Sequence, residues 1–148
     1  MNKQLQEVLF DKYPKLFRQK DLPKSESSLA FGIECGDGWY TLIDELSQEL
    51  TDKYDGIVEY GQIKPKFGIL TVHVDQLNGT GLFNDLNNVV SKYEDRSTIT
   101  CEQCGKKAIR KTVNGWIHTL CSEHIQEVVD RMKDFGEVNV NIFGEPLE

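Results

Sequence analysis

The sequence lacks a long apolar run, a proline-rich stretch and an excess of positive charge, and each absence argues against a class of protein. No stretch approaches the roughly 20 apolar residues that a membrane-spanning helix needs. Only 4 prolines occur in 148 residues, without low-complexity repeats, so we expect an ordered chain. The formal net charge of −7 argues against a general nucleic-acid coat, because phosphate repels an acidic surface.

The beginning of the chain also lacks the apolar stretch of a secretion signal. Residues 1–17, MNKQLQEVLFDKYPKLF, carry polar side chains where a signal peptide has its apolar core. We therefore expect a cytoplasmic protein that makes no contact with a membrane. Thiols stay reduced in the cytoplasm, so paired cysteines there favour metal binding over a disulfide.

Hydrophobic periodicity predicts four helices. In each segment, apolar residues recur three or four positions apart, which places them on one face of a helix. The last of these helices starts inside a cysteine-rich segment. The expected helices cover residues 3–13, 39–50, 81–95 and 125–135.

Alternating or β-branched apolar residues predict strands between these helices. The expected strands cover residues 29–35, 57–63 and 68–74. The last two flank the sequence KPKF, so we expect a hairpin with a connection of four or five residues. Leu70, Val72 and Val74 would face the core. Residues 137–143, EVNVNIF, are either a final strand or part of a tail.

This order of elements predicts the α+β class with one main sheet. We expect residues 1–97 to form a domain in which a small mixed or antiparallel sheet is flanked by helices. Residues 98–136 would form a treble-clef-like zinc module packed on that domain. Residues 137–148 would add a C-terminal strand or tail.

The cysteine-rich segment has the spacing of a metal site. Cys101 and Cys104 form one pair separated by two residues, and Cys121 and His124 form a second. Two such pairs suit a tetrahedral ion, and Gly105 lets the backbone turn after the first pair. The intervening AIRKTVNGWIHTL has an Asn-Gly centre typical of a hairpin. The second pair lies where the last helix begins, where free amides stabilise thiolate.

These four residues predict a structural zinc ion rather than a catalytic one. A catalytic site usually keeps three protein ligands and an open position, whereas four ligands close the site. His118 is an alternative ligand, but it lies in the predicted hairpin, and the two-residue spacing favours His124. A disulfide is the other interpretation of the cysteines. The sequence has neither an HExxH motif nor the zinc motif of the deaminases.

The segment GDGWY combines two glycines with an acid at a predicted helix start. Asp37 fits a helix cap that accepts a hydrogen bond from a first-turn amide, and Thr41 with Asp44 is a rival capping pair. Trp39 belongs to the apolar face of the helix. We favour these structural roles, and we keep Asp37 and Trp39 as candidates for ligand or partner binding because a glycine-flanked helix start also suits an anion.

The segment IKPKFG places two positive charges beside an aromatic ring at a tight turn. Lys64, Lys66 and Phe67 could together hold a nucleotide or an acidic partner. A polar hairpin tip without a ligand is the commoner explanation of such a pattern. Because Pro65 restricts the turn, we expect these residues to lose little freedom on binding.

Two further features suggest chemistry only weakly. His73 and Asp75 share a strand face and would suit a dyad or half of a metal site, but the sequence shows no partnered nucleophile, so we expect a solvated face. Cys35 stands alone and fits a small core residue.

Positive charge is concentrated in the cysteine-rich segment. Residues 101–124 carry four basic and two acidic side chains, whereas both flanking segments are acidic. The four basic residues are the only basis for a nucleic-acid contact, which the acidic remainder of the chain disfavours. They are Lys106, Lys107, Arg110 and Lys111.

Taken together, GDGWYTLIDEL, QIKPKFGIL and CEQCG…WIHTLCSEH resemble a group of small, mostly uncharacterised proteins of bacteriophages and prophages. The resemblance runs from about residue 31 to residue 124. One departure is Thr71, where the group often has an arginine. The resemblance implies a phage accessory protein, and many such proteins act against host defences by binding.

We therefore expect a non-enzymatic zinc-containing protein that blocks a host defence protein or sequesters a nucleotide signal. One alternative is a small hydrolase that acts on a nucleotide through His73 and Asp75. Another is a nucleic-acid-binding module that uses the basic hairpin of the zinc segment.

Overall fold

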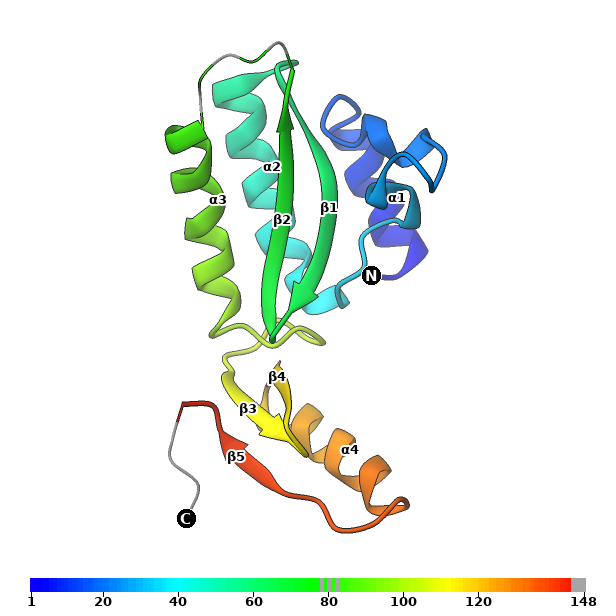
Figure 1. Cartoon of the computed structure of the whole chain (residues 1–148), viewed down its shortest axis with the longest axis vertical. Coiled ribbons are helices and arrows are strands. Elements are labelled where there is room, and N and C mark those ends of the chain that lie inside the picture. Colours follow the sequence, from blue (N-terminus) through cyan, green and yellow to red (C-terminus); the bar gives the residue numbers. More distant parts are fainter. Residues whose placement is uncertain (78, 80, 82, 145–148) are drawn as a thin grey trace.

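The computed structural model describes residues 1–77, 79, 81 and 83–144. Over these residues the protein is α+β, with four α-helices and two small antiparallel sheets (Figure 1). The helices are α1 (Lys3–Lys12), α2 (Tyr40–Tyr54), α3 (Phe83–Ser97) and α4 (Ser122–Lys133). The strands are β1 (Val58–Lys66), β2 (Ile69–Gln76), β3 (Ile109–Val113), β4 (Trp116–Leu120) and β5 (Val140–Ile142).

The four predicted helices are confirmed, with ends that differ by a few residues. Leu82, which the prediction placed in the third helix, lies outside the described residues. The prediction of one main sheet is wrong: β1 and β2 form one sheet, and the order β4-β3-β5 forms another. None of the described helices is long and apolar enough to cross a membrane.

The β1–β2 hairpin packs against α2 and α3, which lie side by side next to β2 in Figure 1. Leu70 and Val72 are buried on that face and Val74 packs at the edge of the core, as the alternation predicts. The connection is shorter than predicted. Phe67 and Gly68 alone make the turn, with φ of 54° and 74°.

The predicted strand at residues 29–35 is wrong. Its first part is a short 3-10 helix, η2 (Ser28–Phe31), and Gly32 follows with φ of 85°. Ile33 and Cys35 are buried as the alternation implies, but they lie in an irregular segment. Phe31, which the alternation places on the same face, is exposed. The alternation therefore matched the burial of three of the four side chains on that face, but it did not indicate a neighbouring strand.

The second sheet has its own apolar core, formed with α4. The β3–β4 hairpin turns at Asn114 and Gly115, with φ of 49° and 84°, as the Asn-Gly pair predicts. β5 pairs with the other edge of β3. Of the two possibilities left open for residues 137–143, a final strand or a tail, the structure shows a short strand. Residues 145–148 lie outside the described residues.

Candidate metal centre

Four side chains from the two predicted pairs converge at the end of the second sheet. The ligand atoms of Cys101, Cys104, Cys121 and His124 all lie within 4.8 Å of one another. The Sγ atoms of Cys104 and Cys121 are 3.8 Å apart, and the Sγ of Cys101 lies 3.5 Å from Nδ1 of His124. All four cysteines of the chain are free thiols, so the disulfide interpretation is wrong.

These spacings fit a tetrahedral metal ion. Ligands about 2.0–2.3 Å from one ion lie roughly 3.3–3.8 Å apart at tetrahedral angles, and the Sγ of Cys121 lies 3.2 Å from Nδ1 of His124. Three sulfurs and one imidazole nitrogen are soft donors of the kind that zinc takes. The described arrangement can therefore hold a metal ion with protein ligands at all four corners.

Local sequence builds each half of this cluster. After Cys104, Gly105 turns the backbone with φ of 79°, and its amide donates to the carbonyl of Cys101 over 2.9 Å. Cys121 is the N-cap of α4, and His124 lies in the first turn of that helix. The free amides of a helix start favour negative charge, so they stabilise thiolate at this place.

The thiols need a positive ion if all three are to lose their protons. Burial acts to raise the pKa of Cys101, but hydrogen bonds from backbone amides lower that pKa overall. Burial and the neighbouring thiols raise the pKa of Cys104. Loss of a proton is thus favoured at Cys101 and opposed at Cys104. A bound cation would stabilise the negative charge on both sulfurs and so lower the pKa of Cys104 as well. His118, the alternative ligand, lies in β4 and is not a member of the cluster.

The GDGWY segment docks directly against the cysteine pair of this centre. The Gly38 amide donates to the carbonyl of Glu102 over 2.7 Å, and the Gly36 amide donates to the Glu102 carboxylate over 3.1 Å. A Cβ on Gly38 would lie 2.1 Å from the carbonyl oxygen of Cys101. The two glycines therefore allow a contact of backbone against backbone that a side chain would prevent.

Asp37 and Trp39, the two further candidates for ligand or partner binding, both make structural contacts. Trp39 is fully buried, and its Nε1 donates to the carbonyl of Thr100 over 2.8 Å. The predicted cap at Asp37 is wrong. Its carboxylate instead accepts from the amide and side chain of Asn2, over 2.7 and 3.0 Å. Neither α2 nor the 3-10 turn before it has a side-chain cap.

The turn of the β1–β2 hairpin makes a second contact with the module. The Phe67 carbonyl accepts from Nη2 of Arg110 over 2.8 Å, and the Gly68 carbonyl accepts from Oγ1 of Thr119 over 2.6 Å. Arg110 also lies over the ring of Phe143, 4.0 Å from its centre. Sequence reasoning placed Arg110 among general basic residues and missed this role, which no local motif reveals.

Side chains of the predicted binding segment face away from the helices. Lys64 and Lys66 alternate with the core residues of β1, so they lie on the face of the hairpin opposite α2 and α3. Lys64 is half-buried and Lys66 is exposed. Phe67 is 77% exposed. The structure thus brings these three residues to one end of the hairpin.

His73, Asp75 and Cys35 are the remaining candidates for chemistry. His73 and Asp75 are both exposed, which confirms the prediction of a solvated face. The Asp75 carboxylate also accepts from Nε2 of Gln19 over 2.8 Å. Burial, together with the negative charge of Glu102, raises the pKa of the Cys35 thiol to about 12. That thiol therefore stays protonated at neutral pH and is a poor nucleophile.

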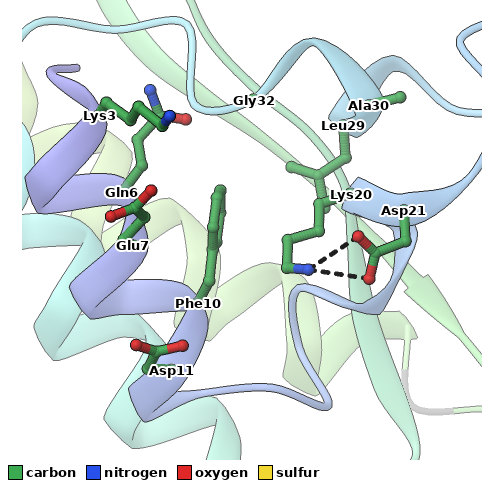
Figure 2. A pocket seen from close by; sticks show the side chains of 10 residues that line it. All are labelled: Lys3, Gln6, Glu7, Phe10, Asp11, Lys20, Asp21, Leu29, Ala30 and Gly32. Carbon is green, nitrogen blue, oxygen red and sulfur yellow. Dashed lines mark hydrogen bonds and ion pairs between the residues drawn. The ribbon is translucent and has the colours of Figure 1, made fainter.

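A cavity of about 520 Å³ lies between α1 and residues 20–32 (Figure 2). The ring of Phe10 points into it, and Nζ of Lys20 lies 5.6 Å from the centre of that ring while pairing with Asp21. Its lining mixes both signs of charge and includes none of the residues predicted to bind. The lining residues are Lys3, Gln6, Glu7, Phe10, Asp11, Lys20, Asp21, Leu29, Ala30 and Gly32.

Comparison of the chain with protein-family models, curated proteins and solved structures gives no match. The functional argument therefore depends on the residues and their geometry.

Proposed function

We propose that the protein is a non-enzymatic binding protein whose module is held together by a structural zinc ion. Three thiols and one imidazole fill a tetrahedral site, and a filled site leaves no position for a reacting water. A cysteine knuckle, a hairpin and a helix whose first turn supplies ligands together support a treble-clef-like arrangement. In this proposal zinc supplies folding energy rather than chemistry.

The observation that carries the proposal is the conformation of Phe67. This residue has a positive φ at a two-residue turn, where glycine, asparagine or aspartate is favoured and a bulky side chain is strained. Its ring is nevertheless 77% exposed, so core packing does not explain it. An exposed aromatic ring on a turn that two hydrogen bonds fix to the module suits a contact surface.

Charge supports an acidic or phosphate-bearing partner for this surface. Within the described residues, neither Lys64 nor Lys66 takes part in an ion pair, although the chain carries a net charge of −7. The resemblance to phage accessory proteins supports a partner in a host cell. We propose a host defence protein, or a nucleotide signal that the protein sequesters in the cytoplasm.

The two alternatives have less support. A hydrolase would need His73 and Asp75 to act together, but Asp75 is bonded to Gln19. A nucleic-acid surface would need the basic residues of the module on one side. Arg110 and Lys111 are neighbours in β3, so their side chains point to opposite faces of the sheet.

The test is native mass spectrometry of the protein purified from the cells that produce it, compared between two charge-reversed variants. We expect a bound species on the wild type that is lost in Lys64→Glu/Lys66→Glu, with an unchanged melting temperature. The matched control Lys106→Glu/Lys107→Glu should retain it. Loss in the control alone would support the nucleic-acid alternative, and turnover of a nucleotide by the wild type would support the hydrolase.

A further inference from the structure

Within the part of the chain that the structure describes, β5 has one backbone edge without a neighbouring strand. It is an outer strand of the second sheet (Figure 1), paired with β3 in the register Lys111 with Ile142 and Val113 with Val140. The Phe143 amide donates to the carbonyl of Arg110 over 3.0 Å. Hydrogen-bonded pairs alternate along an antiparallel ladder, so the backbone groups of Val140 and Ile142 point away from β3.

Apart from its short length, this edge lacks the charges and prolines that usually block strand pairing. Residues 138–143, VNVNIF, contain neither a charge nor a proline in a chain where 28% of residues are charged. The side chains of Val140 and Ile142 are 43% and 42% exposed. Among the described residues, none bonds their outward backbone groups. An uncovered apolar edge strand is a template for another strand.

We propose that two copies of this chain pair through β5 about a two-fold axis that passes beside Asn141. In antiparallel register, Val140 of each copy would lie opposite Ile142 of the other. Each of these two pairs can exchange two hydrogen bonds, so the edges supply four. The β-branched side chains of each pair would then pack together on one face. The two three-stranded sheets become one continuous six-stranded sheet.

A second copy suits this edge for reasons of charge and symmetry. Two chains of net charge −7 repel each other at most places, but the edge itself is uncharged. Lys111 and its symmetry mate would be about 16 Å apart, three strand spacings across the sheet and two residues along it, so their repulsion is screened. Pairing about a two-fold axis closes both edges at once and leaves no free edge for further growth. Because β5 spans only three residues, the dimer should dissociate on dilution.

The association is tested by sedimentation equilibrium of the metal-loaded full chain over a range of concentrations. We expect a reversible monomer–dimer equilibrium. Ile142→Pro removes an outward amide without touching the ladder to β3, so it should raise the dimer dissociation constant about tenfold or more. Phe135→Lys is the matched control, because Phe135 is 91% exposed and lies outside β5. It should leave the dimer unchanged.

A cysteine pair tests the register. In the proposed dimer Asn141 lies directly opposite its own mate, with Cα atoms about 4.5 Å apart, so Asn141→Cys should form an intermolecular disulfide on oxidation. Asn139→Cys should not, because that residue and its mate would be about 13 Å apart. A wild type that stays monomeric would overturn the proposal, even if β5 pairs with a strand of a different protein. Dimerisation without cross-linking at residue 141 would overturn it too.

Discussion

The amide of Gly38 donates a hydrogen bond of 2.7 Å to the carbonyl oxygen of Glu102. Glu102 follows the first cysteine of the metal centre, and Gly38 belongs to the GDGWY segment that precedes α2. This bond joins two segments that are 64 positions apart in the sequence. The residues before α2 can therefore pack against the cysteine segment only when the backbone around Cys101 and Cys104 keeps this conformation.

Gly38→Ala should therefore destabilise the protein. The added Cβ would lie 2.1 Å from the carbonyl oxygen of Cys101 and 2.6 Å from the amide of Cys104. Relieving these overlaps would require the backbone of the cysteine segment to move. We therefore expect a loss of about 2–3 kcal/mol in the free energy of unfolding, measured with urea. The comparison is Gly61→Ala, whose Cβ would lie 2.8 Å from Oδ2 of Asp75 and 3.7 Å from Oε1 of Gln19. Both atoms end side chains, which move more readily than backbone, so this variant should lose clearly less stability than Gly38→Ala, about 1 kcal/mol or less.

Asp37→Ala should loosen the start of α1 rather than that of α2. Its carboxylate holds Asn2, whose own side chain caps α1 by accepting from the amide of Leu5. We expect a loss of about 1 kcal/mol and faster hydrogen exchange in the first turn of α1. Faster exchange confined to the start of α2 would contradict this expectation and would indicate that Asp37 caps α2.

The sequence predicted what depends on local spacing and missed what depends on distant contacts. The metal cluster follows from two pairs of residues, each within one turn of chain, so spacing alone located Cys101, Cys104, Cys121 and His124. The helices follow from periodicity in the same way. The hydrogen bond from Arg110 to the Phe67 carbonyl could not be predicted, because the two residues are 43 positions apart in the sequence.

The predicted strand at residues 29–35 failed for a related reason. The alternation matched the burial of Leu29, Ile33 and Cys35 but not that of the exposed Phe31. A strand also needs a neighbour with free backbone groups. The outer edge of β1 instead receives single hydrogen bonds from irregular chain, such as that from the Glu34 amide to the Ile63 carbonyl over 3.0 Å. A regular ladder does not form there. GDGWY was likewise predicted as a helix start, and its packing against the cysteine knuckle was not.

Phe67→Asn should stabilise the protein while weakening partner binding. Asparagine tolerates positive φ better than phenylalanine does, so relief of strain should raise the free energy of unfolding by about 1 kcal/mol. Phe67→Ala removes the same ring without favouring that backbone conformation, and it should give no such gain. Urea unfolding of both variants measures the difference. A loss of stability in Phe67→Asn would show that the ring packs against the protein.

Glu59 predicts a particular dependence of stability on pH. Its buried carboxylate accepts from Arg18 over 2.6 and 2.7 Å and from Gln19 over 3.0 Å. Chiefly because of the bonds from Arg18, the pKa of Glu59 is lowered from its ordinary value of 4.5. A lowered carboxyl pKa contributes stability that is present above the ordinary value and is lost as the pH falls through the folded value.

Glu59→Gln should therefore cost about 2 kcal/mol at neutral pH, the size of a lost charge-assisted hydrogen bond. The gap between wild type and variant should narrow as the pH falls below 4.5. Urea unfolding at a series of pH values measures the free energy of unfolding of wild type and variant. Loss of metal in acid should lower both values equally and leave their difference unchanged. A gap that stays constant from neutral to acid pH would show that the charge of Glu59 has no part in stability.

X-ray absorption spectroscopy at the zinc edge tests the central claim most directly, because it reports the ligands of the ion in the purified protein. With one zinc ion per chain, we predict three sulfur ligands at about 2.3 Å and one nitrogen ligand at about 2.0–2.1 Å. Cys104→Ser should lose the metal and the folded module together. Absence of zinc, or an oxygen ligand from water in place of one protein ligand, would contradict a closed structural site and reopen the case for catalysis.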